Sequence, residues 1–265
     1  MVSLLLDACL RLPGTYPQKF YVFAESMLQQ ARLHCHDQIY RLMEVEVYFT
    51  SAEHPDPFTH GDALQTQPDI WYWHRKGETY IENSFKGVDI SLGGEGRKGG
   101  LLIRSLLNTQ TGEFIEGTSK VVDALLKQLQ CSSIREVVQR LPSLGVHDPK
   151  SPLRIEWQPP GNEPIYSAPR VGLTLKQPSP VKLSFLMELY RFCLQPELLT
   201  KGKPTLVLAV DIFSKLSLIK PALRQKYWQQ ALTPCQPLQE KGDTVESQLK
   251  LFGWRYQAVM KPLRA

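Results

Sequence analysis

The sequence predicts an α+β protein in which helices pack on a mixed, mainly antiparallel sheet. Segments with the two-residue alternation of strands are interleaved with segments whose apolar residues recur every three to four positions. Two aromatic runs also flank a short basic turn, a pattern typical of a β-hairpin. The chain has 265 residues, of which 42% are hydrophobic and 22% charged, so it is long and apolar enough to bury a core.

The first half of the chain predicts two helices followed by several strands. Pro13 and Gly14 end the first helix, and Phe20, Phe23 and Met27 recur at helical spacing in the second. The expected elements are helices 3–12 and 17–33, strand 41–50, hairpin 71–81, strand 88–90, a glycine-rich loop 93–100 and strand 101–106.

The second half alternates between helices and strands. The hydroxyl of Thr118 or Ser119 can cap one helix, and that of Ser132 or Ser133 the next, because N-cap side chains accept hydrogen bonds from free backbone N–H groups. The expected elements are helices 118–129, 134–141, 183–194 and 220–232, and strands 153–157, 170–175 and 205–210.

A change of composition at Pro178-Ser179-Pro180 divides the chain. Residues 1–177 are expected to form one α+β domain, and residues 178–265 a basic α/β extension packed on it. From position 201 onward there are eleven Lys and Arg against four Asp and Glu, and a solvated cationic face is the ordinary explanation.

The net charge and the cysteines indicate which partners and which compartment to expect. The net charge of +5 mildly favours polyanionic partners. The five cysteines are scattered without a C-x-x-C pair, so we expect neither a disulfide framework nor a metal site. No segment is long and apolar enough to span a membrane. We therefore expect a soluble, intracellular monomer, in the nucleus or the cytoplasm.

The segment Arg41-Leu42-Met43-Glu44-Val45-Glu46-Val47-Tyr48 carries the clearest functional signal. Side chains two apart in a strand share a face, so Glu44, Glu46 and Tyr48 point one way. Two carboxylates on one face of an apolar strand are costly unless that face lines a polar site. An ion pair of Glu46 with Arg41 or Arg104 at a strand end is the structural alternative.

A series of short motifs gives the chain a resemblance to a known family. After the 41–48 segment come a His about a dozen residues on, Leu102-Ile103-Arg104, and Gly117-Thr118-Ser119-Lys120, with a fainter echo at Ala168-Pro169-Arg170-Val171-Gly172. In order and rough spacing the set resembles the alkyladenine (methylpurine, 3-methyladenine) DNA glycosylases. The resemblance covers roughly residues 40–130.

The resemblance implies a role for each matching residue of the site. Glu46 takes the place of the catalytic carboxylate, Tyr48 that of the aromatic ring that stacks on the flipped base, and His60 that of the His on the opposite wall. Arg104 matches the Arg of an L-L-R strand. Asp89 departs from the family, which has Asn there, and so puts in doubt which bases are admitted.

The same resemblance suggests where DNA would lie. The hairpin that wedges into the duplex is shorter here, which leaves Tyr80 and Phe85 as wedge candidates. The remaining candidates for backbone contact are Lys86, Arg97, Lys98, Ser119 and Lys120.

The resemblance implies a monofunctional DNA N-glycosylase that hydrolyses the N-glycosidic bond of an alkylated or deaminated base without any cofactor. An ionised Glu46 would activate water and stabilise an oxocarbenium-like sugar. Asp89 and the short hairpin leave two alternatives open. One is a non-catalytic module that binds DNA, RNA or a modified nucleotide, and the other is a nucleoside N-glycosidase acting on a free nucleoside or nucleotide.

Overall fold

The computed structural model describes residues 2–173, 179–213, 220–233 and 244–260, and it confirms the α+β prediction. These residues form eight α-helices and a nine-stranded sheet in which every pairing between strands is antiparallel. The helices are α1 (Val2–Arg11), α2 (Tyr16–Gln30), α3 (Thr118–Gln128), α4 (Ile134–Arg140), α5 (Pro180–Phe185), α6 (Lys203–Phe213), α7 (Pro221–Leu232) and α8 (Val245–Met260).

The sheet is built around two long strands, β2 (Gln38–Ser51) and β7 (Arg97–Asn108). Its main path runs β10-β11-β2-β7-β6-β3, with β1 on β2, β9 on β1 and β8 on β7. The other strands are β1 (Ala31–Cys35), β3 (Pro68–Trp73), β6 (Val88–Leu92), β8 (Phe114–Glu116), β9 (Leu153–Trp157), β10 (Tyr166–Ala168) and β11 (Arg191–Cys193), and a separate hairpin joins β4 (Arg75–Lys76) to β5 (Thr79–Tyr80).

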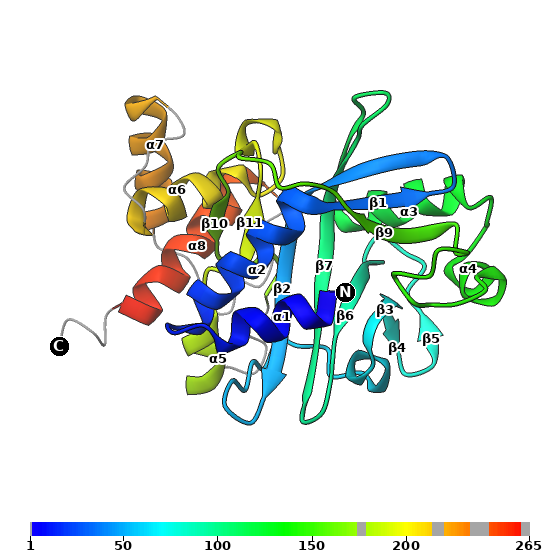
Figure 1. Ribbon diagram of the computed structural model, residues 1–265. Coiled ribbons are helices and arrows are strands. Elements are labelled where there is room, and N and C mark those ends of the chain that lie inside the picture. Colours follow the sequence, from blue (N-terminus) through cyan, green and yellow to red (C-terminus); the bar gives the residue numbers. More distant parts are fainter. Residues whose placement is uncertain (1, 174–178, 214–219, 234–243, 261–265) are drawn as a thin grey trace.

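The two faces of β2 differ as its alternation predicts. Met43, Val45 and Val47 are fully buried in the main core, against which α1 and α2 pack (Figure 1). The opposite face carries Glu44 and Glu46 toward the C-terminal segments. Helices α6, α7 and α8 gather beside β10 and β11, where a second apolar cluster holds them together.

The expected elements beyond residue 165 differ from the structure in three places. Residues 205–210 lie in helix α6 rather than in a strand, because an apolar run without polar interruptions fits a buried helix as well as a buried strand. The predicted helix 183–194 is the short α5 followed by strand β11. The predicted strand 170–175 is irregular up to Leu173, and its last two residues lie outside the described residues.

The sheet continues across the proposed boundary at position 178. Strand β11 pairs with β2 on one side and with β10 on the other, so a segment of the basic extension completes the same sheet. Helix α8 was not expected from the sequence. In the described parts of the chain, no helix has the length and hydrophobicity needed to cross a membrane.

Candidate functional site

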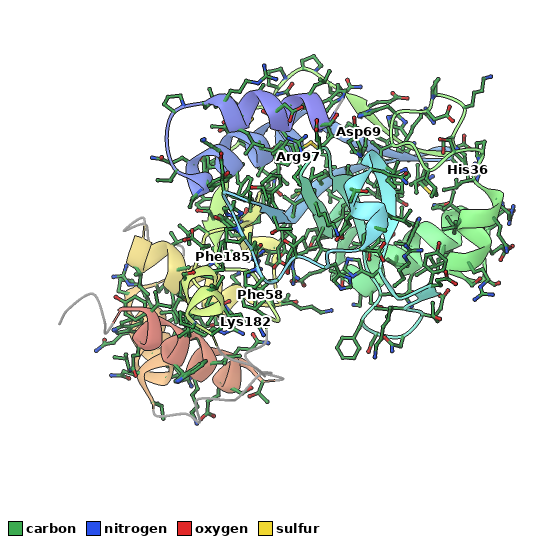
Figure 2. The ribbon with its side chains drawn as sticks, turned by 90° about the horizontal axis from the view of Figure 1, so that it is seen from below. His36, Phe58, Asp69, Arg97, Lys182 and Phe185 are labelled. Carbon is green, nitrogen blue, oxygen red and sulfur yellow. The ribbon has the colours of Figure 1, made fainter. Side chains whose placement is uncertain are left out.

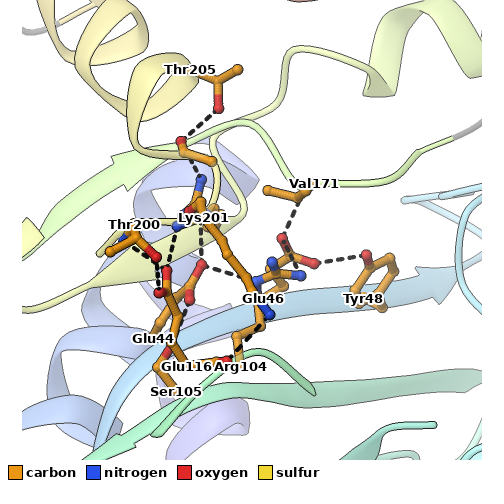
Figure 3. Close-up of polar contacts among 12 residues, drawn as sticks. Glu44, Glu46, Tyr48, Arg104, Ser105, Glu116, Val171, Thr200, Lys201 and Thr205 are labelled. Atoms are coloured by element: carbon orange, nitrogen blue, oxygen red, sulfur yellow. Dashed lines mark hydrogen bonds and ion pairs between the residues drawn. The ribbon is translucent and has the colours of Figure 1, made fainter. Parts of the chain in front are cut away.

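The carboxylate of Glu46 is enclosed by donors from three segments. Val171 donates its backbone N–H to Oε1 over 2.8 Å, and the Tyr48 hydroxyl donates to Oε2 over 2.9 Å (Figure 3). Arg104 approaches Oε1 to 3.4 Å. Glu46 has no exposed surface, so these partners replace the water that an ionised carboxylate requires.

Glu44 is held more tightly than Glu46 and by different groups. Arg191 and Arg104 donate their Nε–H groups to Oε1 over 2.6 and 2.9 Å, and Ser105 donates its hydroxyl to Oε2 over 2.7 Å. Burial alone would raise the pKa of Glu44, but the two guanidinium groups outweigh it and lower the pKa to about 2. Glu44 is therefore a charged anchor of the site.

An irregularity in the β2–β7 pairing explains how two consecutive residues reach the same carboxylate. The register shifts on either side of Glu44, so that Glu44 faces Ser105 and the next pair is Val45 with Ile103. Arg104 is left as the additional residue on β7, as in a β-bulge, and it contacts Glu44 together with Ser105. The alternative partner expected for Glu46, Arg41, instead pairs with Glu163 at 2.7 Å.

The C-terminal half of the chain is tied to this site by Arg191. Its Nη1 donates to the carbonyl of Gly202 over 3.2 Å, and that carbonyl also accepts the hydroxyl of Thr205 at the start of α6 (Figure 3). Glu116 accepts the backbone N–H groups of Thr200 and Lys201 over 2.9 and 2.6 Å. These contacts fix the loop before α6 next to Glu116 and next to Arg191, the partner of Glu44.

A cavity of about 390 Å³ opens on the other side of Tyr48. Lys182 of α5 and Phe58 both line it, and they lie near each other (Figure 2). The full lining is Tyr48, Pro57, Phe58, His60, Gln65, His74, Asp89, Leu102, Gly172, Leu173 and Lys182. Three of the five residues expected at the base-binding and catalytic site therefore share one cavity, namely Tyr48, His60 and Asp89. Glu46 and Arg104 lie behind Tyr48 and contribute no lining surface.

Tyr48 is positioned by a buried ion pair. The Arg170 guanidinium lies 4.5 Å from the centre of the Tyr48 ring and binds both carboxylate oxygens of Asp56, over 2.6 and 3.1 Å. The side chains of Arg170 and Asp56 have no exposed surface. Burial and the nearby charge of Glu46 raise the pKa of Tyr48 well above its ordinary value, so its hydroxyl stays protonated as the donor to Glu46.

Another part of the cavity wall is made of two stacked imidazoles and a buried carboxylate. The His60 and His74 rings lie 5.1 Å apart at 25°, and His74 Nε2 is 2.8 Å from Asp89 Oδ1. Burial lowers the pKa of His60, and the charge of His74 acts in the same direction. For His74 burial is outweighed by Asp89, whose charge and hydrogen bond raise the pKa.

The basic residues expected to contact DNA are mostly engaged in the protein itself. Lys86 pairs with Asp123 at 2.7 Å, and Arg97 pairs with Asp7 of α1. Lys98 donates to the carbonyl of Gly61 over 3.0 Å, beside His60 at the cavity.

The other proposed DNA contacts lie apart from the cavity. Ser119 and Lys120 are in the first turn of α3, and Tyr80 is in the β4–β5 hairpin, packed against the main core. Phe85 follows that hairpin and is 61% exposed.

The sequence did not single out Gln65, His74, Phe58 or Lys182, although all four line the cavity. The alternation of strand β3 could have indicated His74, because a side chain two positions after Tyr72 returns to the same face. Gln65 and Lys182 lie in short helical segments without a periodic pattern, so only the tertiary structure reveals them. Among the described residues, no three His, Cys, Asp or Glu side chains converge in a way that could hold a metal ion.

Comparison with known proteins gives a relative but no described function. No protein-family model matches the chain. The uncharacterized protein L759 of Acanthamoeba polyphaga mimivirus is 33% identical over 172 aligned positions, which cover 59% of this chain and 79% of the viral protein. The chain therefore belongs to the same family as protein L759 of this mimivirus.

Proposed function

We propose that this protein binds a nucleobase in the cavity beside Tyr48 and hydrolyses its N-glycosidic bond, acting as a DNA N-glycosylase on an alkylated or deaminated base. The observation that carries the proposal is the hydrogen bond between the Tyr48 hydroxyl and Glu46, since the Tyr48 ring also lines the cavity. The cavity of about 390 Å³ also falls in the range of about 300–1,000 Å³ that is usual for small-ligand sites.

In the proposed reaction, water attacks the anomeric carbon and the carbon–nitrogen bond breaks. The electron pair of that bond goes to the base nitrogen, and Glu46 takes a proton from the water. This proton then passes to the base nitrogen, which restores the Glu46 carboxylate. The negative charge of Glu46 also stabilises the positive charge that develops on the sugar. Val171, Arg104 and Tyr48 occupy at most three of the four acceptor positions of the Glu46 carboxylate, which leaves one on Oε2 for the water.

The cavity wall supplies the groups that a flipped base requires. Tyr48 and Phe58 offer aromatic surfaces, and His60 and His74 offer a stacked pair of imidazoles. Lys182 lines the cavity and makes no ion pair with any described residue, so it is available for a phosphate of the nucleic acid. The likeness to the alkyladenine DNA glycosylases and the basic character of residues 178–265 favour DNA as the polyanion.

The test is an abasic-site assay on single- and double-stranded oligonucleotides that each carry one alkylated or deaminated base. We expect the wild-type protein to generate alkali-labile abasic sites on at least one of them. Glu46→Gln should abolish the product, because an amide cannot take up the proton from water. Glu53→Gln, which changes an exposed carboxylate, is the matched control and should retain activity. Absence of product from the wild type on every substrate would reject the glycosylase proposal.

A second candidate is a module that binds the base without cleaving it. The observation that favours it is the complete burial of Glu46, whose carboxylate contributes no surface to the cavity. This alternative predicts base-dependent, salt-sensitive binding that Glu46→Gln leaves within about twofold, with no abasic product. A circular dichroism spectrum of the variant checks that loss of activity does not reflect unfolding.

A further inference from the structure

The side-chain amide of Gln65 is buried in the cavity wall with only one of its ends satisfied. Gln65 is 1% exposed and lines the cavity. Its Nε2 donates to Asp89 Oδ2 over 3.2 Å, whereas its Oε1 has no hydrogen-bond partner among the described residues. An unpaired buried acceptor is destabilising, so we expect this oxygen to bind a hydrogen-bond donor.

Asp89 determines which end of the amide remains unpaired. Its Oδ1 is bound to His74 Nε2 at 2.8 Å, and an ionised carboxylate can only accept hydrogen bonds. If the Gln65 amide were turned over, its oxygen would face Asp89 Oδ2 and two acceptors would repel each other. The ion pair of Asp89 with His74 therefore sets Gln65 so that an acceptor is left over.

The backbone around Gln65 leaves this side chain little freedom to move away. Asp62 caps the short 3₁₀ helix Ala63–Thr66 by accepting the N–H of Leu64 over 2.8 Å, and it also pairs with Arg75 at 2.7 Å. Gly93 lies so close that a Cβ on it would stand 2.3 Å from the carbonyl oxygen of Gln65. These contacts fix the backbone at Gln65, and the hydrogen bond to Asp89 Oδ2 positions the amide itself, as preorganised recognition requires.

We propose that Gln65 is a specificity-determining residue of the cavity, and that its Oε1 accepts a hydrogen bond from an N–H group of the bound base. The ligand class is then a nucleobase that carries an exocyclic amino group or a ring N–H on the edge that enters the cavity. The inference rests on the proposed function in requiring that a base occupies the cavity, but it does not depend on hydrolysis.

The test compares three short single-stranded oligonucleotides made of abasic units around one central position. That position carries adenine, purine without the amino group, or no base. Fluorescence anisotropy with the wild-type protein should give tighter binding of the adenine strand than of the purine strand by about tenfold, the effect of one hydrogen bond to a buried acceptor. The strand without a base measures what the phosphates contribute alone.

Two substitutions at position 65 examine the acceptor directly. Gln65→Met and Gln65→Leu remove the oxygen at similar volume and should reduce the preference for adenine over purine to less than about twofold. Gln67→Met is the matched control, since it makes the same change at an exposed position two residues away. Thermal unfolding shows which variants are folded, and either of the two Gln65 variants suffices.

Asp89→Asn offers an independent check because it should turn the Gln65 amide over. The amide introduced by this substitution can accept from His74 through its oxygen and donate to Gln65 Oε1 through its nitrogen, which would place Gln65 Nε2 toward the cavity. The preference for adenine should then fall below about threefold or reverse.

Two results would overturn the inference, and only the first is compatible with a base-binding cavity. Equal binding of adenine and purine strands by the wild type, both tighter than the strand without a base, would remove the role of Gln65 and keep the base-binding cavity. Equal binding of all three strands would overturn the cavity proposal as well.

Discussion

The hydroxyl of Tyr48 donates a 2.9 Å hydrogen bond to Glu46 Oε2, and the ring that carries it lines the cavity. Glu46 itself has no exposed surface. Tyr48 therefore links the buried carboxylate to the cavity. Its ring should contribute mainly to base binding, and its hydroxyl mainly to the reaction.

Tyr48→Phe keeps the ring and removes only the hydroxyl. If the proposed reaction occurs, we expect base binding to change by less than about threefold and the single-turnover rate to fall by about tenfold to a hundredfold. Tyr48→Ala should weaken both, because it also removes the surface beneath Arg170. Anisotropy and single-turnover kinetics separate the two effects, and a rate unchanged in Tyr48→Phe would contradict the role of the hydroxyl.

Glu44 should make the protein sensitive to strong acid. Its pKa is about 2 in the folded protein, against 4.5 for a glutamate side chain without these partners. As the pH falls below 4.5, the unfolded chain takes up the proton first, so stabilisation is fully present above that pH and is lost down to about 2. Over this range the loss is at most about 3 kcal/mol.

The variant Glu44→Gln tests this pH dependence by urea denaturation at about pH 5 and about pH 3, on either side of the ordinary glutamate pKa. It should be less stable than the wild type at the higher pH, by about 3–5 kcal/mol, because Arg104 and Arg191 lose their shared carboxylate. Its stability should then change less between the two pH values. If the free energy of unfolding changed equally with pH in both proteins, the acid sensitivity would not come from Glu44.

Protonation of His54 should destabilise the fold at a milder acid pH than protonation of Glu44. Its Nδ1 lies 2.9 Å from the carbonyl of Phe49, which requires a donor, and its Nε2 lies 2.8 Å from the Tyr190 hydroxyl, so the neutral ring fits this site. Burial lowers its pKa from the ordinary 6.5. As the pH falls below 6.5, the unfolded chain takes up the proton first and stability decreases. The melting temperature should fall between about pH 7.5 and about pH 5.5, and the fall should be smaller in His54→Gln.

The ion pair of Arg170 with Asp56 should show strong coupling in a double-mutant cycle. Both side chains are fully buried, so Asp56→Asn and Arg170→Met each leave an unpaired polar partner and should each cost about 3–5 kcal/mol. The double variant should cost less than the sum by about 0.5–3 kcal/mol. The exposed pair Arg140–Glu136 serves as control and should show no measurable coupling. Additive effects at Arg170 and Asp56 would mean that each is held by other groups.

The elements that local pattern could identify are those with a clear period. Helix α2 was expected from the recurrence of Phe20, Phe23 and Met27, and all three are fully buried in the core. The expected end at residue 33 was wrong, because the helix ends at Gln30 and strand β1 begins at Ala31. Residues 205–210 showed no clear period because the run is apolar on every side. Only its packing in the second apolar cluster decides that it is helical.

Local pattern alone was enough to place Glu44, Glu46 and Tyr48 on one face of β2, because the alternation of side chains is a property of the strand backbone. The different roles of these residues come from the packing of distant segments. Arg191, 147 residues from Glu44 along the chain, makes Glu44 the charged anchor and leaves Glu46 to Tyr48. Likewise, Asp89 orients Gln65 and pairs with His74 only after β3, β6 and the 3₁₀ helix have packed together. Such contacts depend on how segments far apart in the chain pack together, so local periodicity does not predict them.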